Sequence, residues 1–221
     1  EKVIAAVERN LVRLKTDYID LLQWHVNFRE ATMEHFIEGS ARLVEQGKLR
    51  AFGVSTSDYG FIQEFFANGR AQSLQIDYSI LNRTAEAEIF PFCRANGVGT
   101  VIRGGLAMGL LTGKFGADST FEEGDFRRAW TTDADQRTQF LADLETVDRL
   151  KEAFPGANLA QLALRFIISN PDVSVAIPGA KRVSQLEANF AAAEAGLLSA
   201  EEQRAIDQIV PPGGGRKIWP A

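Results

Sequence analysis

The sequence is poor in the residues that build disulfide frameworks and metal sites. It contains one cysteine, Cys93, and two histidines among 221 residues. A single cysteine excludes an intrachain disulfide and a cysteine-based zinc site, and two histidines offer few alternative ligands. We therefore expect a protein without a metal centre.

Long apolar runs and an excess of positive charge are lacking as well. No apolar stretch approaches the length of a membrane-spanning helix. Lysine and arginine number 24 against 29 acidic residues, which gives a net charge of −5. Nucleic acids and anionic membranes are bound through concentrated basic faces, so we expect neither partner. These features favour a cytoplasmic protein.

What the chain does have is a regular alternation of strand-like and helical segments. Apolar runs typical of buried strands lie at residues 18–24, 49–55, 73–79, 99–104 and 173–178. Segments with helical periodicity lie at residues 2–14, 32–47, 58–68, 84–95, 135–153, 158–169, 182–195 and 199–208. Buried strands that alternate with helices form a parallel sheet covered by helices. The pattern alone fits either a small open sheet or part of a (β/α)8 barrel, and no G-x-G-x-x-G follows the first strand.

The domain organisation follows from the same pattern. No repeat or low-complexity segment divides the chain, so we expect one domain over residues 1–210. A polar stretch rich in glycine and aspartate over residues 112–134 predicts a long loop. The turn-rich PPGGGRK predicts a loose tail over residues 211–221.

The short sequence segments at the strand ends favour the barrel. The fragments LKTDYIDLLQWH, GKLRAFGVST, QIDYSILNR, GLLTGKF and LALRFIISNPDVSVAIPGA, followed by QLEANF, resemble the aldo-keto reductase family in order and spacing. The resemblance implies an α/β fold, a (β/α)8 barrel that binds NADPH across the carboxyl ends of its strands and reduces carbonyls. The strands seen here then correspond to the fourth to the eighth. The family's catalytic Asp, Tyr and Lys belong to the earlier strands, so we expect this chain to start after them and to be inactive alone.

His25 is the candidate catalytic residue. It follows an apolar strand, at the end of a barrel where active sites gather. In the family, the histidine of this WH dipeptide orients the substrate carbonyl. A hydrogen-bonded core histidine is the alternative interpretation. Asn27, two residues further on, is a weaker candidate for the mouth of the substrate site.

Ser55, Thr56 and Gln75 are candidates for the nicotinamide carboxamide. They lie at or near two strand ends, and the resemblance assigns the carboxamide to these positions. The carboxamide has one acceptor and two donors, which serine and glutamine side chains complement. The alternative for Ser55 is that it caps the following helix.

Arg103 and the residues after it form the next candidate group. A guanidinium can stack on a ring and donate hydrogen bonds. A buried arginine at a strand end needs an acidic partner or a ligand, and no acid is adjacent in sequence, which favours a ligand. Gly104 and Gly105 replace the family's more usual Ser-Pro pair, which predicts a looser backbone. The resemblance places further cofactor contacts at Gly104, Leu106, Leu111, Gly113 and Lys114, with Lys114 facing the diphosphate.

The segment IPGAKRVSQLEAN predicts a phosphate site. A strand runs into a glycine turn and the next helix begins near Ser184, and helix N-termini bind anions. Lys181 and Arg182 supply the positive charge that the 2′-phosphate of NADPH requires. Ser184 as a simple N-cap is the structural alternative. The resemblance places the adenosine 2′-phosphate and the adenine against Gly179, Lys181, Gln185 and Asn189.

The sequence thus predicts NADPH-dependent reduction of an aldehyde or ketone, with NADP(H) as cofactor and a small carbonyl compound as substrate. Two alternatives stay open. One is a redox-sensing NADPH-binding barrel like the channel β-subunits of the same superfamily, and the other is an unrelated phosphate-binding barrel such as an isomerase. The sequence leaves the substrate and the oligomeric state undefined.

Overall fold

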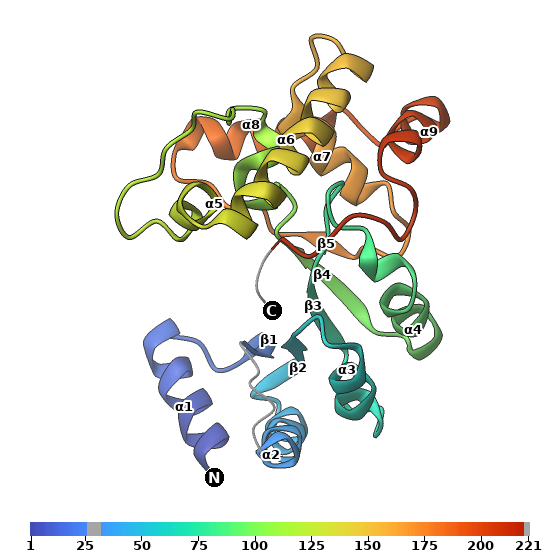
Figure 1. The fold of residues 1–221 in the computed structure, drawn as a ribbon. Coiled ribbons are helices and arrows are strands. Elements are labelled where there is room, and N and C mark those ends of the chain that lie inside the picture. The colour runs from blue at the N-terminus through green and yellow to red at the C-terminus, as the bar shows by residue number, and fades with distance from the viewer. Residues whose placement is uncertain (26–31, 219–221) are drawn as a thin grey trace. The chain divides into compact units, whose positions relative to one another are not determined.

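Five strands alternate with helices along the chain, as the sequence predicts (Figure 1). They are β1 (Ile19–Trp24), β2 (Leu49–Ser55), β3 (Ser73–Asp77), β4 (Gly99–Arg103) and β5 (Val175–Ala176). The order in the sheet follows the order in the chain, and β2 pairs in parallel with both β1 and β3. The candidate residues His25, Ser55 and Arg103 lie at or directly after the ends of β1, β2 and β4.

The computed structural model describes residues 1–25 and 32–218. The chain divides into two compact units, which are described separately. The first unit contains Glu1–Ile76 and Glu88–Val101, and the second contains Asp77–Ala87 and Ile102–Pro220. Within the described residues, no helix is both long and apolar enough to cross a membrane.

The first unit holds the amino-terminal strands and the helices α1 (Lys2–Leu14), α2 (Met33–Glu45), α3 (Tyr59–Phe66) and α4 (Ile89–Asn96). Val7, Leu11, Leu43 and Leu49 form one buried cluster that joins α1, α2 and β2. Gly53 allows β2 and β3 to pair, because a Cβ at this position would lie 1.9 Å from the Ser73 carbonyl oxygen. Only glycine fits there.

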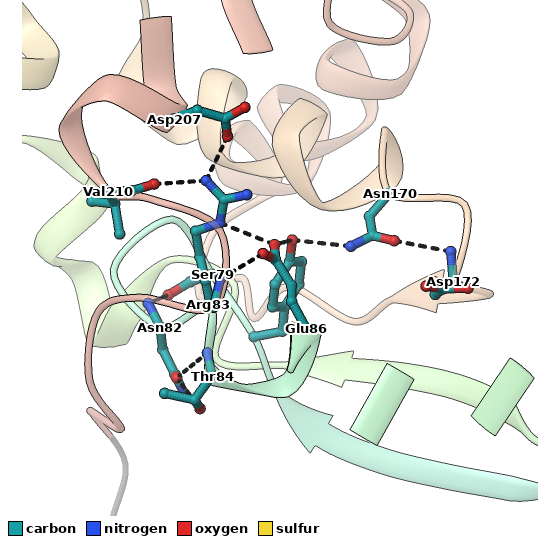
Figure 2. A network of polar contacts seen from close by, with 11 residues as sticks. Ser79, Asn82, Arg83, Thr84, Glu86, Asn170, Asp172, Asp207 and Val210 are labelled. Carbon is teal, nitrogen blue, oxygen red and sulfur yellow. Dashed lines mark hydrogen bonds and ion pairs between the residues drawn. The ribbon is translucent and has the colours of Figure 1, made fainter. Parts of the chain in front are cut away.

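The second unit holds the remaining elements. Its helices are α5 (Ala129–Thr132), α6 (Ala134–Ala153), α7 (Leu159–Ile168), α8 (Val183–Glu194) and α9 (Ala200–Ile209), with short 3-10 helices η1 (Thr84–Glu86), η2 (Ala107–Thr112) and η3 (Phe126–Arg128). A buried polar network joins η1 to the chain around α9 (Figure 2). Arg83 donates to Glu86 at 3.0 Å, to Asp207 at 2.6 Å and to the Val210 carbonyl at 2.7 Å. The buried guanidinium thus has two carboxylates and a carbonyl as partners, although Arg83 is only 3% exposed.

Two elements differ from the prediction. The helix predicted over residues 84–95 is split into η1 and α4, since Pro91 has no N–H to donate and fits only in the first turn of a helix. The strand predicted over residues 173–178 is two residues long. Directly after this strand, the Ile177 amide donates a hydrogen bond to the Ile102 carbonyl of β4. Pro178 has no N–H and cannot continue the ladder.

The end of the chain also differs from the prediction of a loose tail. The described part, residues 211–218, is tied to the second unit by backbone and side-chain bonds. The Arg83 amide donates to the Gly214 carbonyl at 2.9 Å, and the Arg216 amide donates to the Leu81 carbonyl at 3.0 Å. The Arg216 guanidinium pairs with Asp143 of α6, and Ile218 is buried. The turn-forming composition therefore shapes an ordered segment.

Candidate cofactor-binding site

A cleft of about 500 Å³ lies in the second unit. Four segments border it: the chain after β4, the end of α6, the start of α7 with the residues before it, and the first half of α8 with the turn that precedes it. Most of the predicted phosphate and adenosine contacts meet here. The predicted residues that line the cleft are Leu106, Gly113, Lys114, Gly179, Gln185 and Asn189.

The cleft has the electrostatics of an anion site. Two lysines, Lys114 and Lys151, line it, and none of its described lining residues is acidic. The first turns of α7 and α8 also border it, through Asn158 to Ala160 and through Ser184 and Gln185. The free N–H groups and the dipole of a helix N-terminus attract negative charge. A phosphorylated ligand is the class of molecule that this wall favours.

Asn189 provides a direct test of whether a nucleotide fits. Its Nδ2 is buried and has no hydrogen-bond partner among the described residues, although Asn189 borders the cleft. A buried donor without an acceptor is unfavourable by about 1–3 kcal/mol. The ring nitrogens of a base in the cleft are acceptors of the kind that this amide lacks. The residues present therefore fit the predicted dinucleotide.

The turn before α8 is held by Gln185. Its Oε1 accepts hydrogen bonds from the Lys181 amide at 2.7 Å and from the Arg182 amide at 3.1 Å. Arg182 is the N-cap position, so Ser184 lies within the first turn and does not cap the helix. Lys181 is exposed and does not line the cleft itself.

Arg103, Gly104 and Leu111 belong to the same unit but do not line the cleft. Leu111 is 0% exposed and forms part of the core. Gly104 has a φ of 70°, and a Cβ there would lie 1.9 Å from Asp77 Oδ1. The backbone at Gly104 is therefore closely packed, which corrects the prediction of a looser chain.

The environment of Arg103 also differs from the prediction. Burial lowers the pKa of the Arg103 guanidinium, and the Asp77 carboxylate opposes this change. Asp77 is itself buried at the end of β3 and accepts from Asn82 Nδ2 at 2.8 Å. The acidic partner that is missing from the neighbouring sequence thus comes from another strand. Asp77 opposes the effect of burial on Arg103 without cancelling it, and the contact of Arg103 with a cofactor stays a prediction.

The first unit holds the other predicted residues. His25 follows β1 and is exposed, and Asn27 lies outside the described residues. The preceding residue, Trp24, packs on the aromatic rings of Phe36, Phe61 and Phe65, with ring centroids 5.1–6.4 Å away. This packing fixes the end of β1 from which His25 projects.

Ser55, the last residue of β2, is the paired neighbour of Gln75 in the middle of β3. Both are 7% exposed, and the Thr56 amide donates to the Gln75 carbonyl at 3.1 Å. The cap of α3 is Asp58, whose carboxylate accepts from the Phe61 amide at 3.1 Å. The alternative role of Ser55 as a helix cap is therefore wrong, and the pair with Gln75 brings two amide-compatible side chains together.

Sequence reasoning missed part of the cleft. Lys151 of α6 and the start of α7 both line it. The signal for α7 was available, because Asn158 before an apolar run is an N-cap signature, and its Oδ1 accepts from the Ala160 amide at 3.1 Å. Nothing in the sequence relates Lys151 to the residues after β4. The described residues contain no group of three or more potential metal ligands.

Comparison with solved structures identifies the fold class. The holo form of the aldo-keto reductase AKR11C1 from Bacillus halodurans matches 94% of this chain, with a TM-score of 0.74 and 31% sequence identity. The match covers 66% of that chain. The predicted aldo-keto reductase type of barrel, present here as five parallel strands with their helices, is thereby confirmed.

The chain belongs to the Aldo/keto reductase family, whose sequence model matches residues 1–211. It is 32% identical to the aldo-keto reductase YhdN of Bacillus subtilis, over 95% of this chain. It is also 32% identical to the aldo-keto reductase yakc [NADP(+)] of Schizosaccharomyces pombe, over 97%. The NADH-specific methylglyoxal reductase of Escherichia coli is 30% identical over 91%. The chain spans 62–66% of the length of these relatives. Family membership removes the alternative of an unrelated barrel.

Proposed function

We propose that this chain binds NADP(H) and contributes to the reduction of an aldehyde or ketone to an alcohol. The observation that carries the proposal is the cleft of the second unit, where two lysines and two helix N-termini meet the unpartnered amide of Asn189. A dinucleotide has the phosphates and the base that these groups complement. When bound, it supplies the hydride for the reduction.

The candidate residues of the two units have separate roles in this proposal. Lys114 and the start of α7 bind the diphosphate, because charge and free N–H groups coincide there. Asn189 donates to the adenine. Ser55 and Gln75 bind the nicotinamide carboxamide, and Arg103 lies against its ring. His25 donates a hydrogen bond to the substrate carbonyl and orients it.

The preference for NADP(H) over NAD(H) is inferred from the turn before α8. Lys181 and Arg182 precede the helix, and both are exposed. They favour the additional 2′-phosphate. The relatives include one described by its name as NADP(+)-linked and one as NADH-specific, so the preference rests on these two side chains.

We further propose that the chain by itself binds the cofactor and gives no useful turnover. Reduction of a carbonyl requires a proton donor at the developing alkoxide. Tyr78 cannot serve, because it is 1% exposed and its hydroxyl donates to Glu86 at 2.6 Å. Tyr18 lies under Arg50, and Tyr59 packs against Phe92.

Titration of the purified chain with NADPH and NADH, followed by protein fluorescence, tests the binding. NADPH is expected to bind more tightly than NADH, and Asn189→Ala to weaken NADPH binding about fivefold to tenfold. Asn96→Ala is the matched control, since Asn96 is an exposed asparagine of α4. A wild-type chain that binds neither dinucleotide contradicts the proposal. NADPH oxidation in the presence of an aldehyde, abolished by His25→Ala, contradicts the expected lack of turnover.

A further inference from the structure

Lys151 is the feature of the cleft that no sequence motif indicates. It lies near the end of α6 and, like Lys114, is one of the residues that border the cleft. It also borders a second, smaller groove lined by Phe115, Leu144 and Asp148. Lys151 therefore stands on the partition between two hollows of the same unit.

Gly113 explains how the lysine reaches this position. A Cβ on Gly113 would lie 3.3 Å from Lys151 Cε and 3.1 Å from Leu159 Cδ1, and the φ of Gly113 is 69°. The missing side chain lets the alkyl chain of Lys151 pass close to the loop. Lys114 and Lys151, which come from different segments of the chain, consequently both border the cleft.

The present partner of Lys151 is a weak competitor for a phosphate. Lys151 Nζ lies 2.7 Å from Asp148 Oδ1, and the two side chains are 43% and 64% exposed. Exposed ion pairs of this kind contribute little to stability. A phosphate in the cleft offers charge-assisted bonds together with two helix N-termini, so exchange of the carboxylate for the phosphate is favourable.

We propose that Lys151 is a second lysine for the dinucleotide's diphosphate, and that Asp148 competes with the phosphate for it. The inference rests on the proposed function, because it concerns the same cleft. The proposal gives the basic residues of this unit two roles. Lys114 and Lys151 bind the diphosphate. Lys181 and Arg182, which precede α8, select the 2′-phosphate.

The test compares four variants by isothermal titration with NADPH and with NADH. Lys151→Gln removes the charge, Lys151→Arg keeps it, and Asp148→Asn removes the competitor. Lys48→Gln is the matched control, because Lys48 forms an ion pair of the same kind, 2.8 Å from Glu8, in the first unit. The purified chain in low salt is used throughout, since screening weakens exposed charges.

Lys151→Gln is expected to lower the affinity for NADPH and for NADH by the same factor, about tenfold, since both contain the diphosphate. Lys151→Arg is expected to retain most of the affinity, and Asp148→Asn to increase it about twofold to threefold. Lys48→Gln is expected to leave it unchanged. Equal affinities of Lys151→Gln and the wild type overturn the proposal. A loss confined to NADPH overturns the assignment to the diphosphate.

Inorganic pyrophosphate separates failure of this inference from failure of the proposed function. Pyrophosphate is expected to raise the thermal midpoint of the wild type more than that of Lys151→Gln. If the wild type binds neither dinucleotide but keeps this difference, the proposed function fails and the anion site at Lys151 stands. If the wild type binds NADPH, and the wild type and Lys151→Gln have the same NADPH affinity and the same thermal shift with pyrophosphate, only the role of Lys151 fails.

Discussion

At the scale of single residues, the close approach of Asp77 to Gly104 leaves no room for a side chain at position 104. The carboxylate of Asp77 occupies the space that a side chain at position 104 would need, and it is held there by Asn82. A glycine with positive φ thus allows a buried acid to lie beside Arg103. The arrangement explains why glycine stands at position 104, where the sequence alone predicted a looser backbone.

Gly104→Ala is expected to lower the free energy of unfolding by about 2–4 kcal/mol, because the methyl group overlaps Asp77 Oδ1 and the positive φ is strained. Urea denaturation followed by circular dichroism measures the change. Gly116→Ala is the control, since no atom lies within 4 Å of its added Cβ and its φ is not positive. Equal denaturation midpoints for the two variants would show that Asp77 moves aside without loss.

Tyr78 provides the second residue-scale prediction. Burial, and then the nearby Glu86 carboxylate, raise the pKa of the Tyr78 hydroxyl above its usual range. A group whose pKa is raised in the folded state stabilises the fold below its unfolded pKa, about 10, and loses this contribution as the pH rises further. The folded protein therefore resists ionisation of Tyr78, and alkaline conditions favour unfolding.

Tyr78→Phe measures this contribution. At pH 8 the variant is expected to be less stable by about 1–2 kcal/mol, because the bonds to Glu86 and Asn170 are lost. Between pH 9.5 and about 11 the difference is expected to shrink, since only the wild type has this buried hydroxyl to ionise on unfolding. Urea denaturation at several pH values gives both numbers. A difference that is independent of pH would rule out the effect.

At the scale of elements, the segment after α9 is held by a charge pair. The Arg216 guanidinium contacts Asp143 of α6, which is 7% exposed. Burial raises the pKa of Asp143, and Arg216 opposes the rise. The segment also supplies backbone bonds to residues 81–83. The segment therefore belongs to the network of polar contacts that holds the second unit together.

Arg216→Gln is expected to destabilise the chain by about 2–3 kcal/mol, because Asp143 is left buried without its cation. Arg216 itself is about one-third exposed, which keeps the loss below that of a fully buried pair. The double variant Arg216→Gln with Asp143→Asn is expected to recover part of the loss, and denaturant unfolding compares the three proteins. No recovery in the double variant would mean that the guanidinium acts through packing and not through charge.

The elements themselves were largely predictable from the sequence. The periodicity placed α1 and β2 at their observed bounds, because apolar runs and helical faces are local signals. The loop over residues 112–134 was not predictable in the same way. It contains η3 and α5, and Arg127 lies 5.1–5.9 Å from three aromatic ring centroids. These contacts lie within one irregular segment and have no periodic signature in the sequence.

The candidate site shows the same limit. The resemblance identified Asn189 and Lys114, but it gave no reason to expect Lys151 beside them or Asp77 beside Arg103. Each of these contacts joins separate elements whose approach is determined by packing. Glycines at positions 104 and 113 permit that approach, and their role becomes visible only from the atoms around them.

At the scale of the whole molecule, the predicted cofactor contacts divide between the two units. The phosphate and adenosine residues belong to the second unit, and His25, Ser55 and Gln75 belong to the first. The contacts predicted for each unit can therefore be tested separately. Binding of an adenosine fragment alone requires only the second.

Hydrogen exchange can test this division directly. NADPH is expected to slow amide exchange at residues 156–161 and 182–189, and also at residues 53–57 and 73–76, because the predicted carboxamide contacts lie in the latter segments. The fragment 2′,5′-ADP, which has no nicotinamide, is expected to protect only the second unit. Mass spectrometry of peptides from the ligand-free and ligand-bound chain measures both patterns. Protection by NADPH of residues in the second unit alone would contradict the prediction. Ser55 and Gln75 would then have a structural role in the sheet only, and only the adenosine end of the dinucleotide would be bound.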